Sequence, residues 1–372
     1  MALAAPNTAE ANFCISAPHD RICPTFPEDQ PDFSRFFEYR VINAAAQTPF
    51  DLYAWQAFVS LNWAEVVPSD FKEHPGWRGF HRRSDVFDEP AKTCNGNTLT
   101  GDMVLGEIAQ SDGHSLIDQN GNFVVFETRI NQVAHSYILD NVLTTAQGRQ
   151  AIAEKINFPI GTDAARPASV TLKTAWTVLP RPDPSFIQAQ AEIHIPAHET
   201  VEGQAFCVTE RVGLIGMHIV AKVASGHGDK WIWATFEHES TAPTAADARR
   251  INSIYAKELF PGGCTQPSTR DTRRFLLFDP DCKECPTNNP PQNVHWAGSA
   301  PYARQQDGTP AAPSQIVRCW RIFSETRSIN TAWQSKLVRT PLEHYHLISA
   351  QWRGANPDPI FEQGELPRYL SN

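Results

Sequence analysis

The sequence predicts an α+β protein with a β-rich core: a mostly antiparallel sheet or sandwich, with peripheral helices and long proline-rich loops. The centre of the chain contains apolar, strand-like segments separated by turns rather than by regular helices, a pattern that favours antiparallel pairing. The 29 prolines exceed the usual share of roughly 5% and predict long loops. No linker-like segment divides the chain, so we expect one compact domain over 48–372 after a loop-rich arm over 1–47.

The first half of the chain contains one strong helical signal and one hairpin signal. Thr48-Pro49 offers a helix start, and apolar side chains follow at helical spacing, at Trp55, Phe58, Val59 and Trp63. Residues 64–113 are rich in proline, glycine and charge, and they indicate long loops. The turn Asp118–Gly121 predicts a hairpin over 115–128. Helices are expected at 131–143 and 146–155.

The second half is richer in strands. Strands are expected at 169–179, 189–196, 205–210, 213–224, 230–237 and 315–322. Helices are expected at 246–260 and 326–338, a long loop at 261–313 and a further element around 341–352. In the segment 213–223 both faces are apolar, which indicates a central strand, and strict alternation would place His218 and Lys222 on one face with Leu214 and Val220.

Composition and charge exclude several classes of protein. Hydrophobic residues make up 41% and charged residues 20% of the chain, which excludes a disordered chain and a coiled coil. The formal net charge is −9 and the sequence pI about 5.8, so nucleic acid is not an expected partner. The longest apolar stretch, 213–223, is too short to span a bilayer.

The eight cysteines bear on the cellular compartment. An even number spread over loops fits disulfides formed in an oxidising compartment, although free or metal-bound thiols are the alternative. The simplest local bridge is Cys14–Cys23. For the Cys282-Lys-Glu-Cys285 motif we weigh a disulfide within the pair or to other loop cysteines, a zinc site with Cys264 or Cys319, and a redox pair. No histidine follows Cys285, so this is not a haem-attachment motif.

The amino-terminal sequence Met1-Ala-Leu-Ala-Ala-Pro lacks the basic start and long apolar core of a secretory signal. The chain is then either cytosolic or one whose signal has been removed. We favour the second interpretation and expect a secreted or periplasmic protein.

Charged and titratable residues interrupt the apolar strands. His218 and Lys222 lie in the expected central strand, Lys173 in the strand before it, and Glu127 ends the hairpin strand. Trp231, Trp233 and Glu237 share one strand face, and His238 lies on the other. Because an unpaired buried charge costs several kcal/mol, such a set is either an internal network or a functional site.

The sequence contains no Gly-x-Ser-x-Gly elbow, His-Glu-x-x-His helix, phosphate-binding loop or dinucleotide fingerprint. Serine-hydrolase, zincin, nucleotidase and Rossmann hypotheses therefore lose support. The best remaining metal or acid–base hypothesis combines His218, Glu237 and His238. His194 with His198, and His344 with His346, are weaker candidates for a metal-binding pair.

Several sequence blocks resemble a group of bacterial extracytoplasmic proteins that are sometimes labelled "cytochrome c family". The blocks are residues 55–63 (WQAFVSLNW), 116–121 (LIDQNG), 213–220 (GLIGMHIV), 231–238 (WIWATFEH) and the loop 282–291. The resemblance implies a secreted or periplasmic setting and directs attention to His218, Glu237 and His238. It implies no particular reaction, and this chain lacks a carboxy-terminal Cys-x-x-Cys-His, so covalent haem is not expected.

Two functional hypotheses follow. In the first, the protein is an extracytoplasmic metal-dependent enzyme, with oxidoreductase slightly favoured over hydrolase. His218 and His238 would bind a mononuclear zinc, iron or copper ion, Glu237 would be a third ligand or general base, and Lys173 and Glu127 would contact a small-molecule substrate. In the second, the protein is a non-catalytic secreted ligand-binding or structural protein, and the same residues form a buried polar network.

Overall fold

The computed structural model confirms the β-rich α+β fold and describes most of the chain, namely residues 25–28, 44–67, 76–87, 92–94, 97–99, 101, 103–109, 114–152, 155–224, 231–249 and 268–351. The helices are α2 (Ala44–Leu61), α3 (Trp63–Val66), α4 (Arg83–Val86), α5 (Gln132–Asp140), α6 (Ala146–Ala151) and α7 (Ser324–Lys336), with 3-10 turns η3 (Gly76–Gly79), η5 (Ala197–Glu199) and η7 (Pro341–His344). No helix among these residues is long and apolar enough to cross a membrane.

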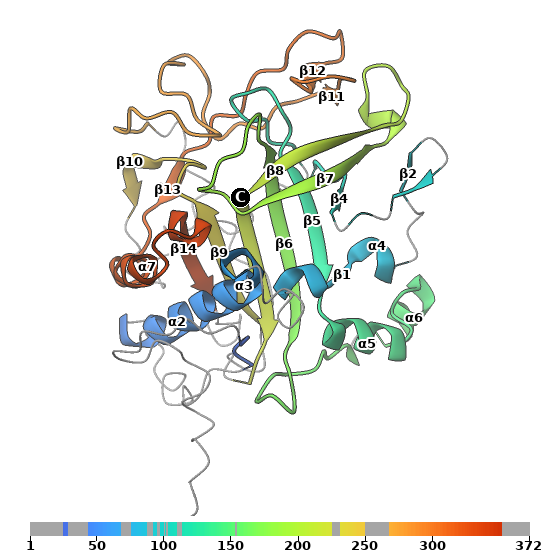
Figure 1. The fold of residues 1–372 in the computed structure, drawn as a ribbon, viewed down its shortest axis with the longest axis vertical. Coiled ribbons are helices and arrows are strands. Elements are labelled where there is room, and N and C mark those ends of the chain that lie inside the picture. The colour runs from blue at the N-terminus through green and yellow to red at the C-terminus, as the bar shows by residue number, and fades with distance from the viewer. Residues whose placement is uncertain are drawn as a thin grey trace, which may run out of the picture.

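One large sheet organises the molecule (Figure 1). Its strands are β1 (His81–Arg82), β4 (Val104–Leu105), β5 (Val125–Ile130), β6 (Ser169–Val178), β7 (Gln188–Ile195), β8 (Phe206–Lys222), β9 (Trp231–His238) and β14 (Tyr345–Gln351). Small two-stranded sheets are formed by β2 (Thr93–Cys94) with β3 (Asn97–Thr98), β10 (Thr244–Arg249) with β13 (Arg318–Trp320), and β11 (Val294–Trp296) with β12 (Ala303–Gln305).

The main sheet is mostly antiparallel, and its long central strand is β8. The strand order is β1-β5-β6-β8-β7-β4, with β9 added to β8 and β14 added to β9. The first half of β8 pairs with β7, and its second half pairs with β9. The exception to antiparallel pairing is β4 beside β7. The end of β4 then returns to β5, because the Phe126 amide donates to the Glu107 carbonyl at 2.8 Å. The sheet therefore curls on itself.

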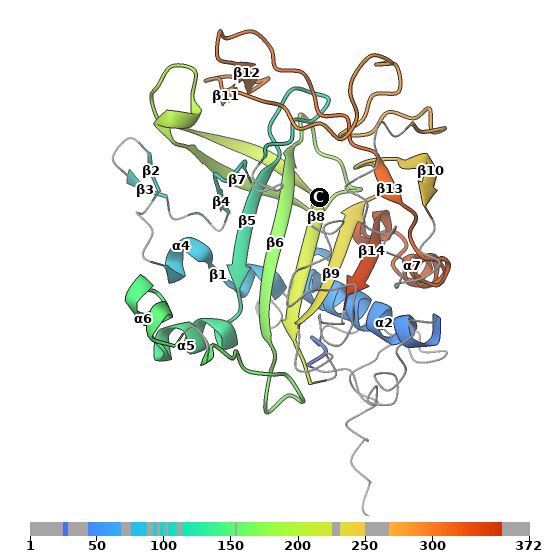
Figure 2. The ribbon, with the colours of Figure 1, turned by 180° about the vertical axis from the view of Figure 1, so that it is seen from behind.

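The apolar face of the sheet packs on α2 and α7. Phe58 of α2 stacks on Phe236 of β9 with ring centres 4.1 Å apart. Trp55 stacks on Trp333 of α7 at 5.6 Å, and its indole donates to the Asn330 side chain at 2.8 Å. Seen from behind, α2 lies beyond the β8, β9 and β14 part of the sheet (Figure 2). Burial of large aromatic rings at this layer is the main apolar contribution to stability.

The helical periodicity that begins near Thr48 corresponds to α2, but this helix starts at Ala44. It therefore begins inside the segment 1–47 that the sequence assigned to a loop-rich arm. The expected strands at 205–210 and 213–224 are one continuous strand, β8.

A β-bulge corrects the predicted facing of β8. Ala175 pairs with Gly216, but the next residue of β6, Trp176, pairs with Leu214. Ile215 is therefore an extra residue that reverses the alternation. Leu214 is fully buried in the main core with Trp176, on the side opposite His218, and not on the face that strict alternation gave it.

The expected helix at 246–260 is wrong for its described part. Residues 244–249 form β10, which pairs in parallel with β13. A distant strand supplies this pairing, so tertiary contact overrides the local helix preference of an alanine-rich segment. The remaining residues of the expected helix lie outside the described part of the chain.

Disulfides occur as the cysteine count suggested. Cys282 and Cys285 are bonded to one another, with Cα atoms 5.5 Å apart, so within-pair bonding is the correct alternative for this motif. Cys207 on β8 and Cys319 on β13 are also disulfide-bonded. The expected bridge Cys14–Cys23 lies outside the described residues.

Candidate functional site

Several of the residues singled out in the sequence meet on the half-exposed face of the sheet. Lys173 of β6, His218 of β8 and Thr235 of β9 are direct cross-strand partners, and such partners lie on one face. Glu237 follows Thr235 by two residues and shares that face. The structure therefore brings Lys173, His218 and Glu237 to one face, without His238, which the sequence hypothesis combined with His218 and Glu237. We call the set Lys173, His218, Thr235, Glu237, Arg318 and His346 the sheet-face cluster.

His218 is held as a neutral imidazole. Its Nδ1 lies 2.9 Å from the Thr235 hydroxyl and accepts a long hydrogen bond, 3.4 Å, from the Trp233 indole. Because an indole nitrogen can only donate, Nδ1 is an acceptor and the proton of the neutral ring is on Nε2. Burial, together with a smaller effect of Lys173 and against the opposing effect of Glu237, lowers the pKa of His218 to about 4.

Glu237 is an ion-pair partner. The Arg318 guanidinium of β13 donates to its carboxylate and also donates to the Thr244 hydroxyl at 3.2 Å. Burial would raise the pKa of Glu237, but Arg318, His346 and His218 together hold it below the ordinary value. Glu237 is therefore ionised at neutral pH. Its carboxylate is already bonded to a cation, so its main role here is structural.

His346 of β14 is the direct partner of Glu237. Burial lowers its pKa to about 4, and Arg318 acts in the same direction. Its Nε2 is buried and has no hydrogen-bond partner in the described part of the chain. At neutral pH the cluster thus contains two neutral histidines beside one ion pair, which costs far less to bury than unpaired charges would.

His238 lies on the opposite face of β9, where its ring stacks on Phe186 with centres 3.8 Å apart. Its Nε2 is 3.1 Å from the Ser185 carbonyl, and its Nδ1 is 2.8 Å from the Ser240 hydroxyl. A carbonyl only accepts, so Nε2 carries the proton. Burial lowers the pKa of His238 to about 4, and the ring is a satisfied core side chain.

The two expected metal ligands, His218 and His238, therefore do not meet, because the sheet separates them. Among the residues that the structure describes, no three His, Cys, Asp or Glu side chains are grouped so that they could hold a metal ion. His344, a weaker candidate, instead binds Glu239 at 2.8 Å. The described geometry lends the predicted mononuclear metal site no support.

A different polar site lies at the edge of β5. Phe126 pairs with Glu107 at the end of β4, and Arg129 and Ile130 pair with β1. Between these contacts, Glu127 and Thr128 have no strand beside them on this edge among the described residues. The curled sheet therefore has a gap between β4 and β1.

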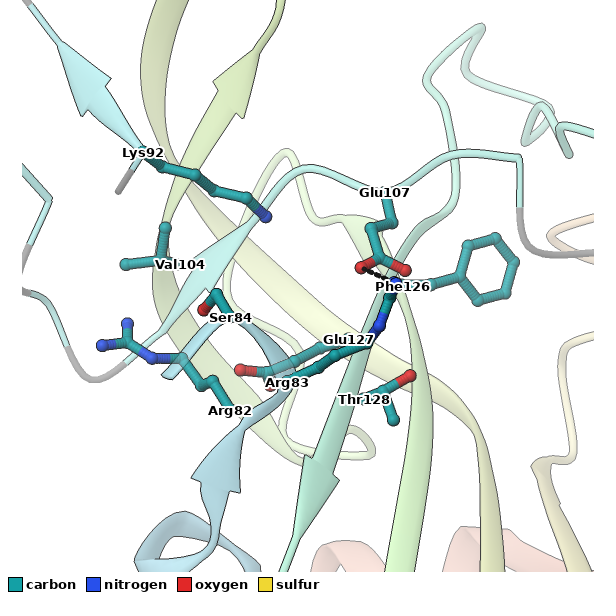
Figure 3. A pocket seen from close by; sticks show the side chains of 9 residues that line it. All are labelled: Arg82, Arg83, Ser84, Lys92, Val104, Glu107, Phe126, Glu127 and Thr128. Carbon is teal, nitrogen blue, oxygen red and sulfur yellow. Dashed lines mark ion pairs between the residues drawn. The ribbon is translucent and has the colours of Figure 1, made fainter. Parts of the chain in front are cut away.

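A pocket opens at this gap (Figure 3). We call it the gap pocket, and it is lined by Arg82, Arg83, Ser84, Lys92, Val104, Glu107, Phe126, Glu127 and Thr128. Its interior offers about 20 Å³ to the centre of a water molecule, and one water needs roughly 10–15 Å³. The pocket is also partly open to solvent. It can therefore hold a very small molecule or the polar end of a larger one.

Glu127 is the most unusual side chain of the gap pocket. Only 5% of its side chain is exposed, and its Oε1 is 2.9 Å from Arg129 Nε. Arg129 thus holds the carboxylate by charge at hydrogen-bond distance, but the two atoms are poorly aligned, and neither oxygen of Glu127 accepts a well-aligned hydrogen bond from the described residues. Burial raises the pKa of Glu127, although Arg129, Arg82 and Lys92 oppose that change. A buried acceptor without a donor costs about 1–3 kcal/mol, and more when it is charged.

Among the described residues, Lys92 lacks an interaction that the other cations in and beside the gap pocket make. In the pocket or beside it, Arg82 pairs with Asp85, Arg83 with Glu107 and Arg129 with Glu127. For Lys92 the described part of the chain provides no ion pair. Figure 3 shows its ammonium reaching into the same space as Glu107. A Cβ at Gly106 would lie 3.3 Å from the Lys92 Nζ, so the glycine leaves room for this ammonium.

The gap pocket and the sheet-face cluster adjoin at β6. Lys173 pairs across the sheet with Thr128, which lines the pocket. Its ammonium lies 5.4 Å from the centre of the Phe126 ring. Burial lowers the pKa of Lys173, and Glu107 partly restores it.

Sequence reasoning identified Glu127 but missed Lys92, Glu107 and Arg82, which lie in the segment 64–113 that it assigned to loops. It also missed Arg318, and it named His346 only as a possible metal-binding partner of His344. Both residues reach Glu237 from strands distant in the sequence. A usable signal for Glu127 was its charge within an apolar strand. The others carry no comparable local signal, because long-range pairing brings them to their sites.

Comparison with known proteins adds no identification: no protein-family model matches the chain, and no curated protein or solved structure shows significant similarity to it.

Proposed function

We propose that the protein is a non-catalytic, extracytoplasmic ligand-binding protein, and that the gap pocket binds a small polar molecule. The sheet-face cluster then acts as the polar network that holds β8, β9, β13 and β14 together. One observation carries the proposal: Glu127 is almost wholly buried at the pocket, yet neither of its carboxylate oxygens accepts a hydrogen bond.

Buried polar groups in folded proteins nearly always have a hydrogen-bond partner, and an exception calls for an explanation. Arg129 provides an ion pair through its Nε but no well-aligned hydrogen bond, and its Nη1 donates instead to the carbonyls of Arg78 and Phe80 at 3.1 and 3.2 Å. A donor from solution can reach Glu127 through the gap. Water or a ligand can supply it, and a ligand that also contacts Lys92 gains a second interaction that water makes less well.

The extracytoplasmic setting is supported by the cysteines. The bonded pair Cys282–Cys285 and the disulfide-bonded Cys207 and Cys319 are expected in an oxidising compartment and are rare in the cytosol. Quantification of unmodified thiols in protein isolated from its native cells, alkylated before lysis, tests this part. Bonded cysteines are expected, and fully reduced thiols at these positions would contradict it.

Binding is tested with a thermal-shift screen of small carboxylates, polyols, amines and neutral amides. The screen compares the wild type with Glu127→Gln, His218→Gln and the surface variant Lys283→Gln. We expect at least one class of compound to raise the melting temperature of the wild type, of His218→Gln and of Lys283→Gln. The same compounds should leave the melting temperature of Glu127→Gln unchanged.

Two outcomes of the screen would contradict the proposal. One is that no class stabilises the wild type. The other is stabilisation that depends on His218 and not on Glu127. Elemental analysis of the same samples, purified without chelators, provides a separate check: stoichiometric metal that is lost in His218→Gln would favour the metal-dependent enzyme instead.

A further inference from the structure

The chemistry of the gap pocket also restricts which molecule fits it. Two groups there can take a further partner: the Lys92 ammonium, which lines the pocket, and the Glu127 carboxylate, whose oxygens accept no well-aligned hydrogen bond among the described residues. An occupant that satisfies both must accept from a cation at one end and donate to a carboxylate at the other. A carboxylate does the first, and a hydroxyl does the second.

The charges of the residues that line the pocket also favour a ligand with one negative charge. The lining contains three cations, Arg82, Arg83 and Lys92, and two carboxylates, Glu107 and Glu127. Arg83 is paired with Glu107, Arg82 with Asp85 outside the pocket, and Glu127 with Arg129. Among the described residues Lys92 has no ion pair, although it acts electrostatically on Glu127 and Glu199. One negative charge on a ligand neutralises Lys92, whereas a cation would be repelled and a dianion would bring excess charge into a site beside two carboxylates.

We infer that the ligand is a small hydroxycarboxylate monoanion, with its carboxylate on Lys92 and its hydroxyl donating to Glu127. This inference rests on the proposed function and names the ligand class for the same pocket. The interior holds little more than one water, so only one end of such a molecule can be enclosed, and the other end must lie in the partly open mouth of the pocket. Thr128 and Ser84, which also line the pocket, provide hydroxyls that can bond to either end of such a molecule.

The test is isothermal titration of the full chain with three matched probes of about the same size. Glycolate has both groups, acetate lacks the hydroxyl, and ethylene glycol lacks the carboxylate. We expect glycolate to bind the wild type at least about tenfold more tightly than either of the others, since one hydrogen bond to a charged group contributes about 1.5–3 kcal/mol.

Two variants test which pocket residue contacts the hydroxyl of the ligand and which contacts its carboxylate. In Glu127→Gln the preference for glycolate over acetate should shrink to within about threefold, because the hydroxyl loses its charged acceptor. In Lys92→Gln the preference for glycolate over ethylene glycol should shrink in the same way. Lys283→Gln, on an exposed loop, should leave both ratios unchanged. Lys92 lies outside the helices and strands, so its variant is expected to fold, and a melting curve for each variant checks this.

The outcomes separate the two proposals. If acetate binds as tightly as glycolate, or if ethylene glycol binds best in a manner that depends on Glu127, the gap pocket is a binding site but the hydroxycarboxylate inference is wrong. The inference is also overturned if both preferences persist in Glu127→Gln and Lys92→Gln. If none of the probes binds, and the broader screen also shows no Glu127-dependent ligand, both proposals fail.

Discussion

The sheet-face cluster and the gap pocket are adjacent, and each contains a carboxylate beside an arginine, but they differ in how completely their groups are bonded. In the cluster, Glu237 accepts from Arg318, and the neighbouring histidines are neutral. In the pocket, Glu127 is more deeply buried and has an arginine at 2.9 Å, but it accepts no hydrogen bond. A group of titratable residues is therefore not by itself evidence of a functional site. Unsatisfied bonding capacity beside an opening is the more specific signal.

A third buried carboxyl, Asp51 of α2, sharpens this comparison and should produce the largest effect. It is fully buried and accepts from Thr326 at 2.6 Å and from Gln47 at 2.8 Å. Burial raises its pKa to about 7, against the hydrogen bonds from Thr326 and Gln47. A raised carboxyl pKa stabilises the fold below its unfolded pKa, and this contribution is lost as the pH rises through the folded value.

We therefore expect the free energy of unfolding to fall by up to about 4 kcal/mol between pH 4 and pH 8 from this residue alone. Asp51→Asn should make the free energy of unfolding depend less on pH between pH 4 and pH 8. Urea unfolding at several pH values, on both proteins, measures the difference. An identical pH profile for the two proteins would show that Asp51 does not titrate in this range.

The second largest effect should come from breaking the sheet-face ion pair. Arg318→Met leaves Glu237 half-buried without its cation. The side chains of Arg318 and Glu237 are 13% and 26% exposed, so the cost should lie between that of a buried and that of an exposed pair, at about 2–3 kcal/mol. The double variant Arg318→Met/Glu237→Gln should recover part of this loss, because it removes the unpaired charge.

The matched control is Arg273→Met, which breaks an exposed pair with Asp271 and should change the free energy of unfolding by less than about 1 kcal/mol. Equal losses for Arg318→Met and Arg273→Met in urea titrations would mean that the sheet-face cluster does not support the fold.

These effects bear on how much of the molecule the sequence predicts. The order and type of the central strands could be predicted, because each has its own alternating pattern and turn signals. The facing of Leu214 could not, because the bulge at Ile215 becomes visible only once β6 and β8 are paired. Likewise, the pairing of Glu237 with Arg318 joins strands 81 residues apart, and no local pattern encodes it.

The candidate site shows the same limit. Lys173, His218 and Glu237 could be singled out because neighbouring apolar strands each carried a titratable residue, but the hypothesis also included His238, which lies on the other face of β9. The gap at β5 arises because, among the described residues, no strand pairs with Glu127 and Thr128 between the contact to Glu107 and the pairing with β1. The strands on either side of the gap, β4 and β1, are short and lie in a segment without periodicity. Glu127 could be singled out from its strand, but not the opening beside it.

The disulfide pair Cys282–Cys285 should contribute less than the sheet-face ion pair. It closes a loop of only a few residues, for which the chain-entropy relation gives at most about 2 kcal/mol. The double variant Cys282→Ser/Cys285→Ser should stay folded and keep its ligand affinity, since neither cysteine lines the gap pocket. Differential scanning calorimetry measures the stability change, and loss of folding would show that the loop is essential.

The smallest effect on stability should come from Glu127→Gln. This is so although the Glu127 side chain is less exposed than those of Glu237 and Asp271, the other two ion-paired carboxylates compared here. The change removes a charge that accepts no hydrogen bond, so the loss of the Arg129 interaction is offset by a smaller cost of burial. We expect a change within about 1 kcal/mol. A loss as large as that of Arg318→Met would mean that Glu127 is a structural residue and would remove the distinction between the two regions.

The central claim, that the ligand binds at the gap pocket and not at the sheet-face cluster, is tested most directly by mapping a bound probe. Transverse-relaxation-optimised amide spectra of the deuterated, assigned protein would be recorded with and without saturating glycolate. We predict shifts at Lys92, Glu107, Glu127 and Thr128, with the Trp233 indole, which faces His218, unchanged. Shifts centred on Trp233 and His218, with β5 unaffected, would contradict it.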